Sequence, residues 1–176
     1  NIVYSRQGAG TFVRAPARVP VLGFAPVESI ADIQRCYEFR LTIEPEAAFY
    51  AARRRDEEAL ARIAASLAQL RDATRHYLHR EDADFSFHRS VTAAANNHYY
   101  TSSIEALKQH ISVGMHLHGL SLMGPNLRLR GVFDEHRLIY DAIAAGQADD
   151  ARAAMRRHLE GSRDRLFEGH SLDLSL

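Results

Sequence analysis

The residues most able to do chemistry in this sequence are histidines, ten of them among 176 residues. Histidine changes charge near neutral pH and is the commonest metal ligand in proteins. Asp84 and His88 are four residues apart, so on a helix they share one face, with Cβ atoms about 6 Å apart. Phe85 and Phe87 flank that face and Val91 continues it, which indicates burial. A carboxylate beside an imidazole there is either a structural pair or half of a metal site.

A second pair of histidines lies on either side of Gly146. His136 is ten residues before this glycine and His158 twelve after it, which places them about 15 Å and 18 Å from the turn of a helical hairpin. Two antiparallel helices would therefore hold them at nearly the same height. Three imidazoles and one carboxylate form a ligand set for a divalent metal ion, with room for an outside ligand. The spacing alone leaves this site and a structural role for the histidines evenly balanced.

The other histidines have no matched partner. His116 and His118 flank an expected loop, and for them we have no preferred role. We expect the remaining five to be solvated on polar faces or helix ends: His76, His79, His98, His110 and His170.

Arg40 stands among apolar neighbours, where arginine is seldom found without a carboxylate to bind. Two partners remain open. One is Glu44, four residues further on the same helix, and the other is the carboxylate of a bound organic acid, which Arg40 would hold with two hydrogen bonds.

Helices must position these residues, because from Ser29 onward the sequence is rich in Ala, Leu, Arg and Glu with helical periodicity. We expect an all-α antiparallel bundle of six or seven helices. Pro45 is expected to end or kink the first helix, Asp56 to cap the third, and Gly146 to stop the sixth. The expected helices span residues 30–43, 45–54, 57–77, 82–95, 99–117, 133–145 and 148–167, with one long loop at 119–131.

The N-terminal part differs in charge and pattern. The whole chain has 22 basic and 22 acidic residues, yet residues 1–27 carry +3 and the remainder −3. Two β-branched or aromatic triplets flank a glycine turn at 7–10, which predicts a short β-hairpin. A proline-containing linker follows it. We therefore divide the chain into a hairpin at 1–14, a linker at 15–28, a helical domain at 29–168 and a tail at 169–176.

Composition excludes several classes of protein. The balanced charge excludes a strongly basic nucleic-acid module and an acidic disordered tail. Cys36 is the single cysteine, so no internal disulfide or multi-cysteine metal site can form. No apolar run approaches the roughly 18 residues that span a bilayer. These features predict a cytoplasmic protein with no membrane partner.

Taken together, the motifs resemble the FCD effector-binding domain of the FadR subclass of GntR-type bacterial transcription regulators. The similar segments are Glu38-x-Arg40, Glu44-Pro45-x-Ala47-Ala48, Ala51-Ala52, Asp84-x-x-Phe87-His88, Asn97, Glu135-His136-x-x-Ile139, Ala142-Ile143-x-x-Gly146 and Ala151-x-x-Ala154-Met155-x-x-His158-Leu159. The segment 6–13, with Arg6, Gly8 and Gly10, is similar to the wing that ends the family's winged helix-turn-helix. Gln147 departs from the family's common Asp, and most of the helix-turn-helix is missing.

The resemblance implies a function for each part. Asp84, His88, His136 and His158 would bind a divalent metal ion, expected to be zinc, with nickel or manganese as alternatives. Arg40 would bind the carboxylate of a small effector, as in the metal-containing branch of the family. The protein would be a homodimeric regulator and not an enzyme. The hairpin would be the remnant of a DNA-binding domain, which binds operator DNA only in a longer protein.

Two other functions remain open from the sequence. A metalloenzyme acting on a small organic acid could use the same ligands to activate water, although no separate general base stands out. A purely structural dimerisation bundle would need neither metal nor effector.

Overall fold

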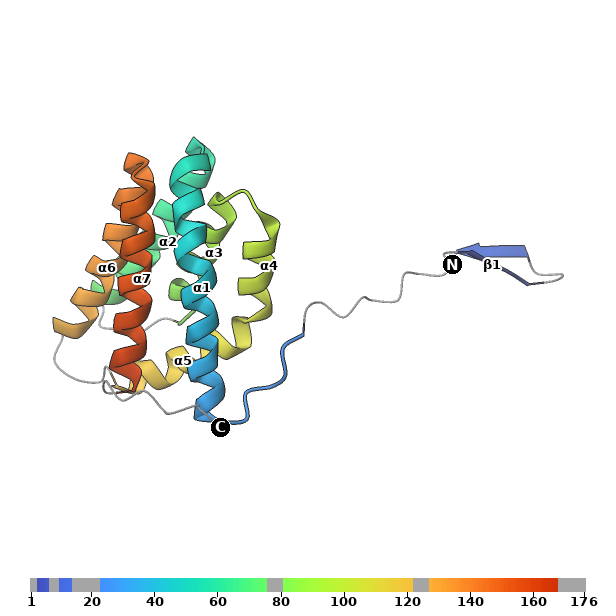
Figure 1. The fold of residues 1–176 in the computed structure, drawn as a ribbon, viewed down its shortest axis with the longest axis horizontal. Coiled ribbons are helices and arrows are strands. Elements are labelled where there is room, and N and C mark those ends of the chain that lie inside the picture. The colour runs from blue at the N-terminus through green and yellow to red at the C-terminus, as the bar shows by residue number, and fades with distance from the viewer. Residues whose placement is uncertain (1–2, 7–9, 14–22, 76–80, 122–126, 168–176) are drawn as a thin grey trace.

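The computed structural model describes residues 3–6, 10–13, 23–75, 81–121 and 127–167, and its helical part is a bundle (Figure 1). Two strands come first, followed within the described residues by seven helices. The elements are β1 (Val3–Arg6), β2 (Gly10–Val13), α1 (Ile30–Arg54), α2 (Glu57–Arg75), α3 (Glu81–Ala94), α4 (His98–Ala106), α5 (Lys108–Ser121), α6 (Leu127–Ala145) and α7 (Ala148–Leu166).

Helix α1 begins at a capping box. The Ser29 hydroxyl accepts from the Asp32 amide, and the Asp32 carboxylate accepts from the Ser29 amide at 2.9 Å, so two otherwise unpaired amides are satisfied. The helix then runs through Pro45, so the expected helix end there was wrong. The expected kink stays a prediction. A proline has no amide to pair with the carbonyl four residues earlier. That carbonyl, of Leu41, instead accepts from Arg156 of α7 at 3.4 Å.

Two more expected boundaries were wrong. The expected helix 99–117 is divided at Leu107 into α4 and α5, and the Leu107 side chain is buried among apolar neighbours. The expected loop 119–131 is mostly helical, since α5 extends to Ser121 and α6 starts at Leu127. Gly131 lies within α6, where glycine costs only about 1 kcal/mol relative to alanine. The other helix ends agree within a few residues, and Asp56 accepts from the Ala59 amide at 2.7 Å as expected for a cap.

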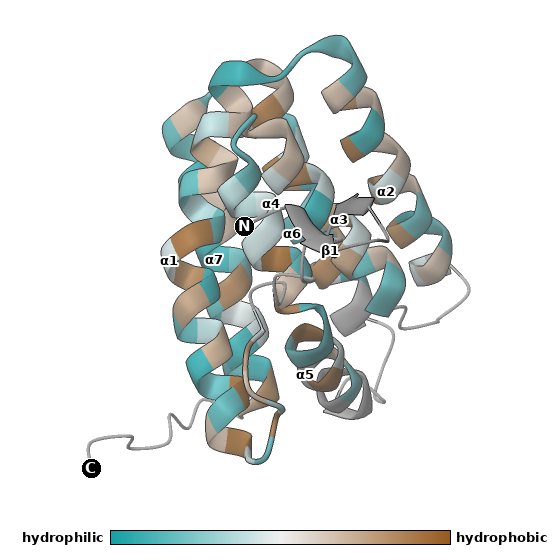
Figure 2. Ribbon diagram, turned by 90° about the vertical axis from the view of Figure 1, so that its right-hand side faces the viewer, coloured by the Kyte–Doolittle hydropathy of each residue, from teal (hydrophilic) through white to brown (hydrophobic). Residues whose placement is uncertain are grey.

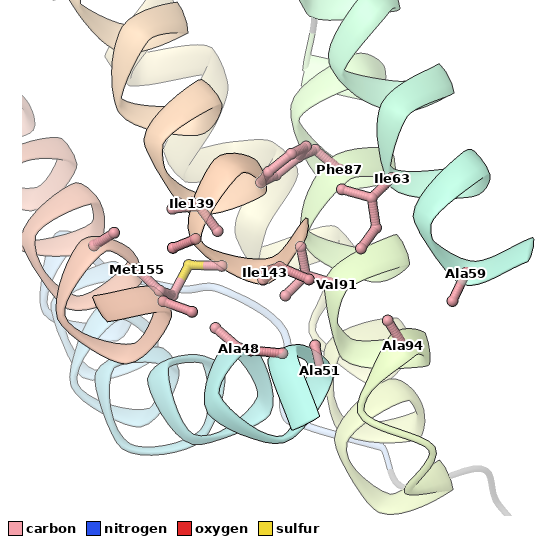
Figure 3. Close-up of a cluster of buried hydrophobic side chains, with 14 of the residues drawn as sticks. Ala48, Ala51, Ala59, Ile63, Phe87, Val91, Ala94, Ile139, Ile143 and Met155 are labelled. Carbon is pink, nitrogen blue, oxygen red and sulfur yellow. The ribbon is translucent and has the colours of Figure 1, made fainter. Parts of the chain in front are cut away.

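The core lies between α1, α2, α3, α6 and α7. Phe87, Ile139, Ile143 and Met155 point toward one another from three of these helices (Figure 3). On α1 the facing residues are fully buried alanines, including Ala48, and small side chains let α7 pack closely against α1 along much of its length. Hydrophobic and hydrophilic residues alternate along both helices (Figure 2). No helix in the described ranges is long and apolar enough to cross a membrane.

The N-terminal strands form the expected antiparallel hairpin. Val3 pairs with Val13, and Arg6 pairs with Gly10. The turn residues 7–9, including Gly8, lie outside the described residues. The assignment of this hairpin to a winged helix-turn-helix stays a prediction.

The turn between α6 and α7 depends on Gly146, whose φ of +75° is in the left-handed region. We expect Gly146→Ala to destabilise the domain by more than about 1 kcal/mol, because that region is costly for a residue with a side chain. An added Cβ would also lie 2.8 Å from Nη2 of Arg55, which donates to the Ala144 carbonyl at 3.3 Å. Urea unfolding gives the change in free energy.

Gly131→Ala is the matched control, because Gly131 lies within α6, the helix that ends just before Gly146. Nothing lies within 4 Å of a Cβ at this exposed position, so alanine should stabilise the domain by about 0.5–1 kcal/mol. Equal effects of the two substitutions would contradict the role of backbone conformation at Gly146.

Candidate metal centre

The four residues selected by spacing converge in the interior of the bundle. Asp84 and His88 come from α3, His136 from α6 and His158 from α7, and one ligand atom of each lies within 4.8 Å of the others. None of the four is more than 4% exposed. The prediction that these side chains meet is confirmed.

Inside the cluster, the Nε2 atoms of the histidines face one another and the carboxylate. Nε2 of His88 lies 3.2 Å from Nε2 of His158 and 3.7 Å from Oδ2 of Asp84. Nε2 of His136 lies 3.1 Å from Oδ1 of Asp84. The phenyl ring of Phe87 meets the His136 ring edge to face, with 4.9 Å between centroids, and closes one side of the cluster.

Outside the cluster, each imidazole uses its other nitrogen to bind an acceptor. Nδ1 of His88 contacts the Glu44 carboxylate. Nδ1 of His136 lies 2.8 Å from the Val132 carbonyl, and Nδ1 of His158 lies 2.9 Å from Oε2 of Glu135. Carbonyl and ionised carboxylate oxygens only accept, so each ring donates from Nδ1 and, when neutral, has no proton on Nε2.

When all three rings are neutral, this arrangement brings four electron-pair donors together without a hydrogen to share. Despite its short distance from Asp84, Nε2 of His136 has no hydrogen-bond partner among the described residues, and neither has Oδ2 of Asp84. Bare nitrogens and a carboxylate that face one another repel, and buried polar atoms without partners are costly. A divalent cation bound by imidazole and carboxylate would satisfy all four. The residues present therefore fit a metal ion.

The charge states in the cluster also suit a cation. Burial would raise the pKa of Asp84, but the nearby His88 and His136 reverse this and hold it well below its usual value. Burial, together with repulsion from His136, lowers the pKa of His158 to about 3. At neutral pH the centre thus contains an ionised carboxylate and a neutral His158, the states in which these groups bind metals.

These pKa shifts predict that the metal-free domain loses stability in acid. The folded-state pKa of His158 is about 3 instead of 6.5, so the unfolded chain binds a proton first as the pH falls. The contribution of His158 to the free energy of unfolding is fully present above about pH 6.5 and is lost as the pH falls toward 3.

Glu44 acts in the same direction. Burial would raise the pKa of Glu44, but Arg40 and His88 lower it to about 2, so its contribution to the free energy of unfolding is lost as the pH falls below about 4.5. Each proton taken up on unfolding costs up to about 1.4 kcal/mol per pH unit.

Urea unfolding in the presence of a chelator, at several values from about pH 7 to pH 4, measures this loss. The His158→Ala variant should show a shallower dependence between about pH 6.5 and pH 4.5, because it lacks the group that titrates there. Identical slopes for this variant and the parent chain would contradict the assignment to His158.

Arg40 is also inside the bundle and is 2% exposed. Its Nε donates to Oε1 of Glu44 at 2.6 Å, which confirms Glu44 as an internal partner. Its guanidinium lies over the ring of Tyr37, 5.3 Å from the centroid.

The sequence did not predict the roles of Glu44 and Glu135 beside the histidines. Glu135 was detectable from the sequence. It is eleven residues before Gly146 and His158 is twelve after it, so the distance from the turn that paired His136 with His158 also pairs Glu135 with His158. Glu44 was expected only beside Arg40. Its contact with His88 joins α1 to α3 across 44 residues, and no local spacing predicts that.

Among the other histidines, His98 is exposed as expected. His116 is 70% exposed and lies 3.3 Å from Glu81. The expectation of a solvated side chain was wrong for His110, which is half-buried, because its Nε2 donates to the Ala25 carbonyl at 2.8 Å and its ring meets that of Phe24. His76, His79, His170 and the side chain of His118 lie outside the described residues.

Both partners of His110, Phe24 and Ala25, lie in residues 23–28, a segment that we call the strap. Phe24 of the strap also packs on Phe39, with 5.9 Å between ring centroids. Strap, α1 and α5 surround a cavity of about 290 Å³, which Cys36 and Leu107 also line. Burial raises the pKa of the Cys36 thiol to about 11. Because the thiolate is the reactive form, this cysteine lines the cavity as an unreactive thiol.

Comparisons with known proteins agree on one family. Residues 35–161 match the FCD domain. The HTH-type transcriptional regulator LutR of Bacillus subtilis is 28% identical over 174 residues, which cover 94% of this chain and 78% of LutR. The uncharacterised HTH-type transcriptional regulator YcbG of the same organism is 27% identical over 133 residues, and the match spans 53% of YcbG and 75% of this chain.

Solved structures show the same fold. Streptococcus agalactiae GntR matches with a TM-score of 0.67 at 23% identity, over 93% of this chain and 74% of that one. E. coli McbR/YncC matches with a TM-score of 0.67 at 16% identity, over 97% of this chain and 79% of that one. At these identities the likeness concerns the fold alone.

Proposed function

This chain belongs to the FCD domain family, and from that membership we propose that residues 29–168 are the sensor domain of a ligand-responsive, DNA-binding transcription regulator of the GntR type. The comparisons match it to transcription regulators and not to enzymes, so the metalloenzyme alternative is set aside. In the sensor, a metal ion and a small carboxylate effector would together control binding to operator DNA.

The proposed metal site consists of Asp84, His88, His136 and His158. The observation that carries this proposal is the convergence of their ligand atoms within 4.8 Å, with two of those atoms lacking any hydrogen-bond partner in the described ranges. Zinc suits this borderline donor set, and nickel or manganese could replace it. When bound, the ion would offer its remaining coordination positions to a carboxylate oxygen.

Arg40 is the proposed cation for the effector. Its Nε is engaged by Glu44, whereas the two terminal nitrogens of the guanidinium are further hydrogen-bond donors. Those nitrogens could donate to one carboxylate oxygen of an organic acid.

The remaining parts of the proposal concern DNA and assembly. We place the wing remnant at residues 1–14, with Arg6, Gly8 and Gly10 near the phosphate backbone, and a linker at 15–28. A homodimer in the cytoplasm would bring two such modules to one operator, and a difference in effector affinity between dimer geometries would control release.

The metal content of protein purified without added metal tests the first step. Elemental analysis should find about one equivalent of a divalent metal per chain, or its uptake on addition of zinc, nickel or manganese. A content below about 0.1 equivalent with no uptake of the three metals would contradict the proposal.

Mass spectrometry of co-purified small acids tests the second step. An intact carboxylic acid released on denaturation would support a sensor, whereas a converted product would support the enzyme alternative. Arg40→Lys retains the charge opposite Glu44 but loses the planar group. The acid identified in this way should bind the variant more weakly, and unchanged affinity would remove Arg40 from the effector site.

A further inference from the structure

Two of the three imidazoles at the centre are held by the same arrangement. Nε of Arg40 donates to one oxygen of Glu44, and the other oxygen contacts Nδ1 of His88. In the second instance, Arg165 donates to both oxygens of Glu135 at 2.8 Å and 2.9 Å, and Nδ1 of His158 lies 2.9 Å from one of them. Each is a chain of arginine, glutamate and histidine that ends at the cluster.

We propose that Glu44 and Glu135 are positioning residues, which fix the proton of His88 and His158 on Nδ1 and so keep both Nε2 atoms ready to bind the metal. Neither glutamate is itself a ligand. This inference rests on the proposed metal site for its purpose, while the proton positions it specifies exist without any metal.

The arginines make the glutamates reliable acceptors. Burial would raise the pKa of both carboxyls, but for Glu44 the charge of Arg40 and the contact with His88 lower it to about 2. For Glu135, the hydrogen bonds from His158 and Arg165 have the same effect. An ionised carboxylate has no hydrogen to donate, so the facing Nδ1 must carry the proton. Such outer partners orient metal-binding histidines and make them more basic.

His136 provides a comparison within the same cluster. Its Nδ1 donates to the backbone carbonyl of Val132, four residues earlier on α6, and no side-chain substitution removes that acceptor. The position of its proton should therefore be insensitive to changes at either glutamate.

The two chains differ in exposure. Glu44 and Arg40 are buried, at 0% and 3% side-chain exposure, whereas Glu135 and Arg165 are 30% and 25% exposed. Water can partly replace the Glu135 carboxylate, so its loss should perturb the site less and should not threaten folding. Glu135 is thus the better position for a test, and Glu44 the position of larger effect.

The experiment compares Glu44→Gln, Glu135→Gln and the control Glu46→Gln. Glu46 lies two residues from Glu44 on α1, but it pairs with Arg152 and is 39% exposed. Competition with a chromophoric chelator measures zinc affinity. We expect a loss of about 10–100-fold in the Glu44 and Glu135 variants and less than about twofold in the Glu46 variant, whose ion pair lies at the surface.

Nitrogen-15 NMR of the metal-free protein gives the decisive second measurement, since it distinguishes protonated from bare ring nitrogens. In the parent chain His88 and His158 should carry the proton on Nδ1. Because a glutamine side chain can also donate, each variant should populate the Nε2–H form of its own histidine and leave His136 unchanged. Circular dichroism checks folding, and if Glu44→Gln does not fold, Glu135→Gln alone decides.

Unchanged proton positions in the folded variants, or a loss of affinity equal to that of Glu46→Gln, would overturn the inference. A parent chain with the expected proton positions but no zinc affinity would instead contradict the proposed metal site. The two failures are therefore distinguishable.

Discussion

Replacing Glu44 with alanine is expected to destabilise the domain by about 3–5 kcal/mol, the usual cost of removing one partner from a buried ion pair. Glu44 is fully buried and Arg40 is 2% exposed. The substitution would leave the guanidinium in the interior without its counter-charge, and Nδ1 of His88 would lose its acceptor. Urea unfolding monitored by circular dichroism measures the free energy.

Glu46→Ala is the matched control for this prediction. It removes a partly exposed partner of Arg152 on the same helix, and surface pairs contribute only about 0–1 kcal/mol. The double variant Arg40→Met with Glu44→Leu should regain much of the lost stability, because apolar replacement of a whole buried pair is often tolerated. Equal losses for Glu44→Ala and Glu46→Ala would show that the buried pair has no special role.

Zinc is expected to raise the melting temperature of the domain strongly. A ligand that binds only the folded state at about 100 times its Kd adds about 2.7 kcal/mol, which for a domain of this size is a shift of about 5–11 °C. His158→Ala should abolish the shift because it removes one of four convergent ligands. Differential scanning fluorimetry with zinc and with chelator measures it.

His98→Ala controls for adventitious binding of zinc to surface histidines, since His98 is exposed and outside the cluster. This variant should keep the full shift. If His158→Ala kept it too, the ion responsible would bind elsewhere on the chain.

Local patterns predicted most of the helices, but they failed where tertiary contacts decide. Pro45 read as a helix end because it lacks an amide, yet α1 continues through it, packed against α7, with Arg156 at the freed Leu41 carbonyl. Glycine and proline near residues 119–131 read as a loop, yet Gly131 is helical. Among the described residues the helix count agreed with expectation, because one expected break was absent and one unexpected break was present.

The site was predictable to the extent that it depends on helical spacing. Asp84 and His88 lie on a single helix, and His136 and His158 lie on a single helical hairpin. Their positions along the helix axes therefore follow from residue counts. The outer contact from Glu44 depends on how α1 packs against α3. That packing is set by the whole core, which no local spacing describes.

The interrupted hydrogen bonding of α1 has a mechanical consequence. A helix bends most easily where its backbone ladder is broken, and in α1 that place is Pro45, the residue after Glu44. Helix α1 should therefore bend most easily beside the Glu44 carboxylate that contacts His88. The strap adjoins the N-terminal end of the same helix. By thermodynamic reciprocity, if bending α1 changes affinity at the centre by some factor, occupancy of the centre must change the bending equilibrium by the same factor.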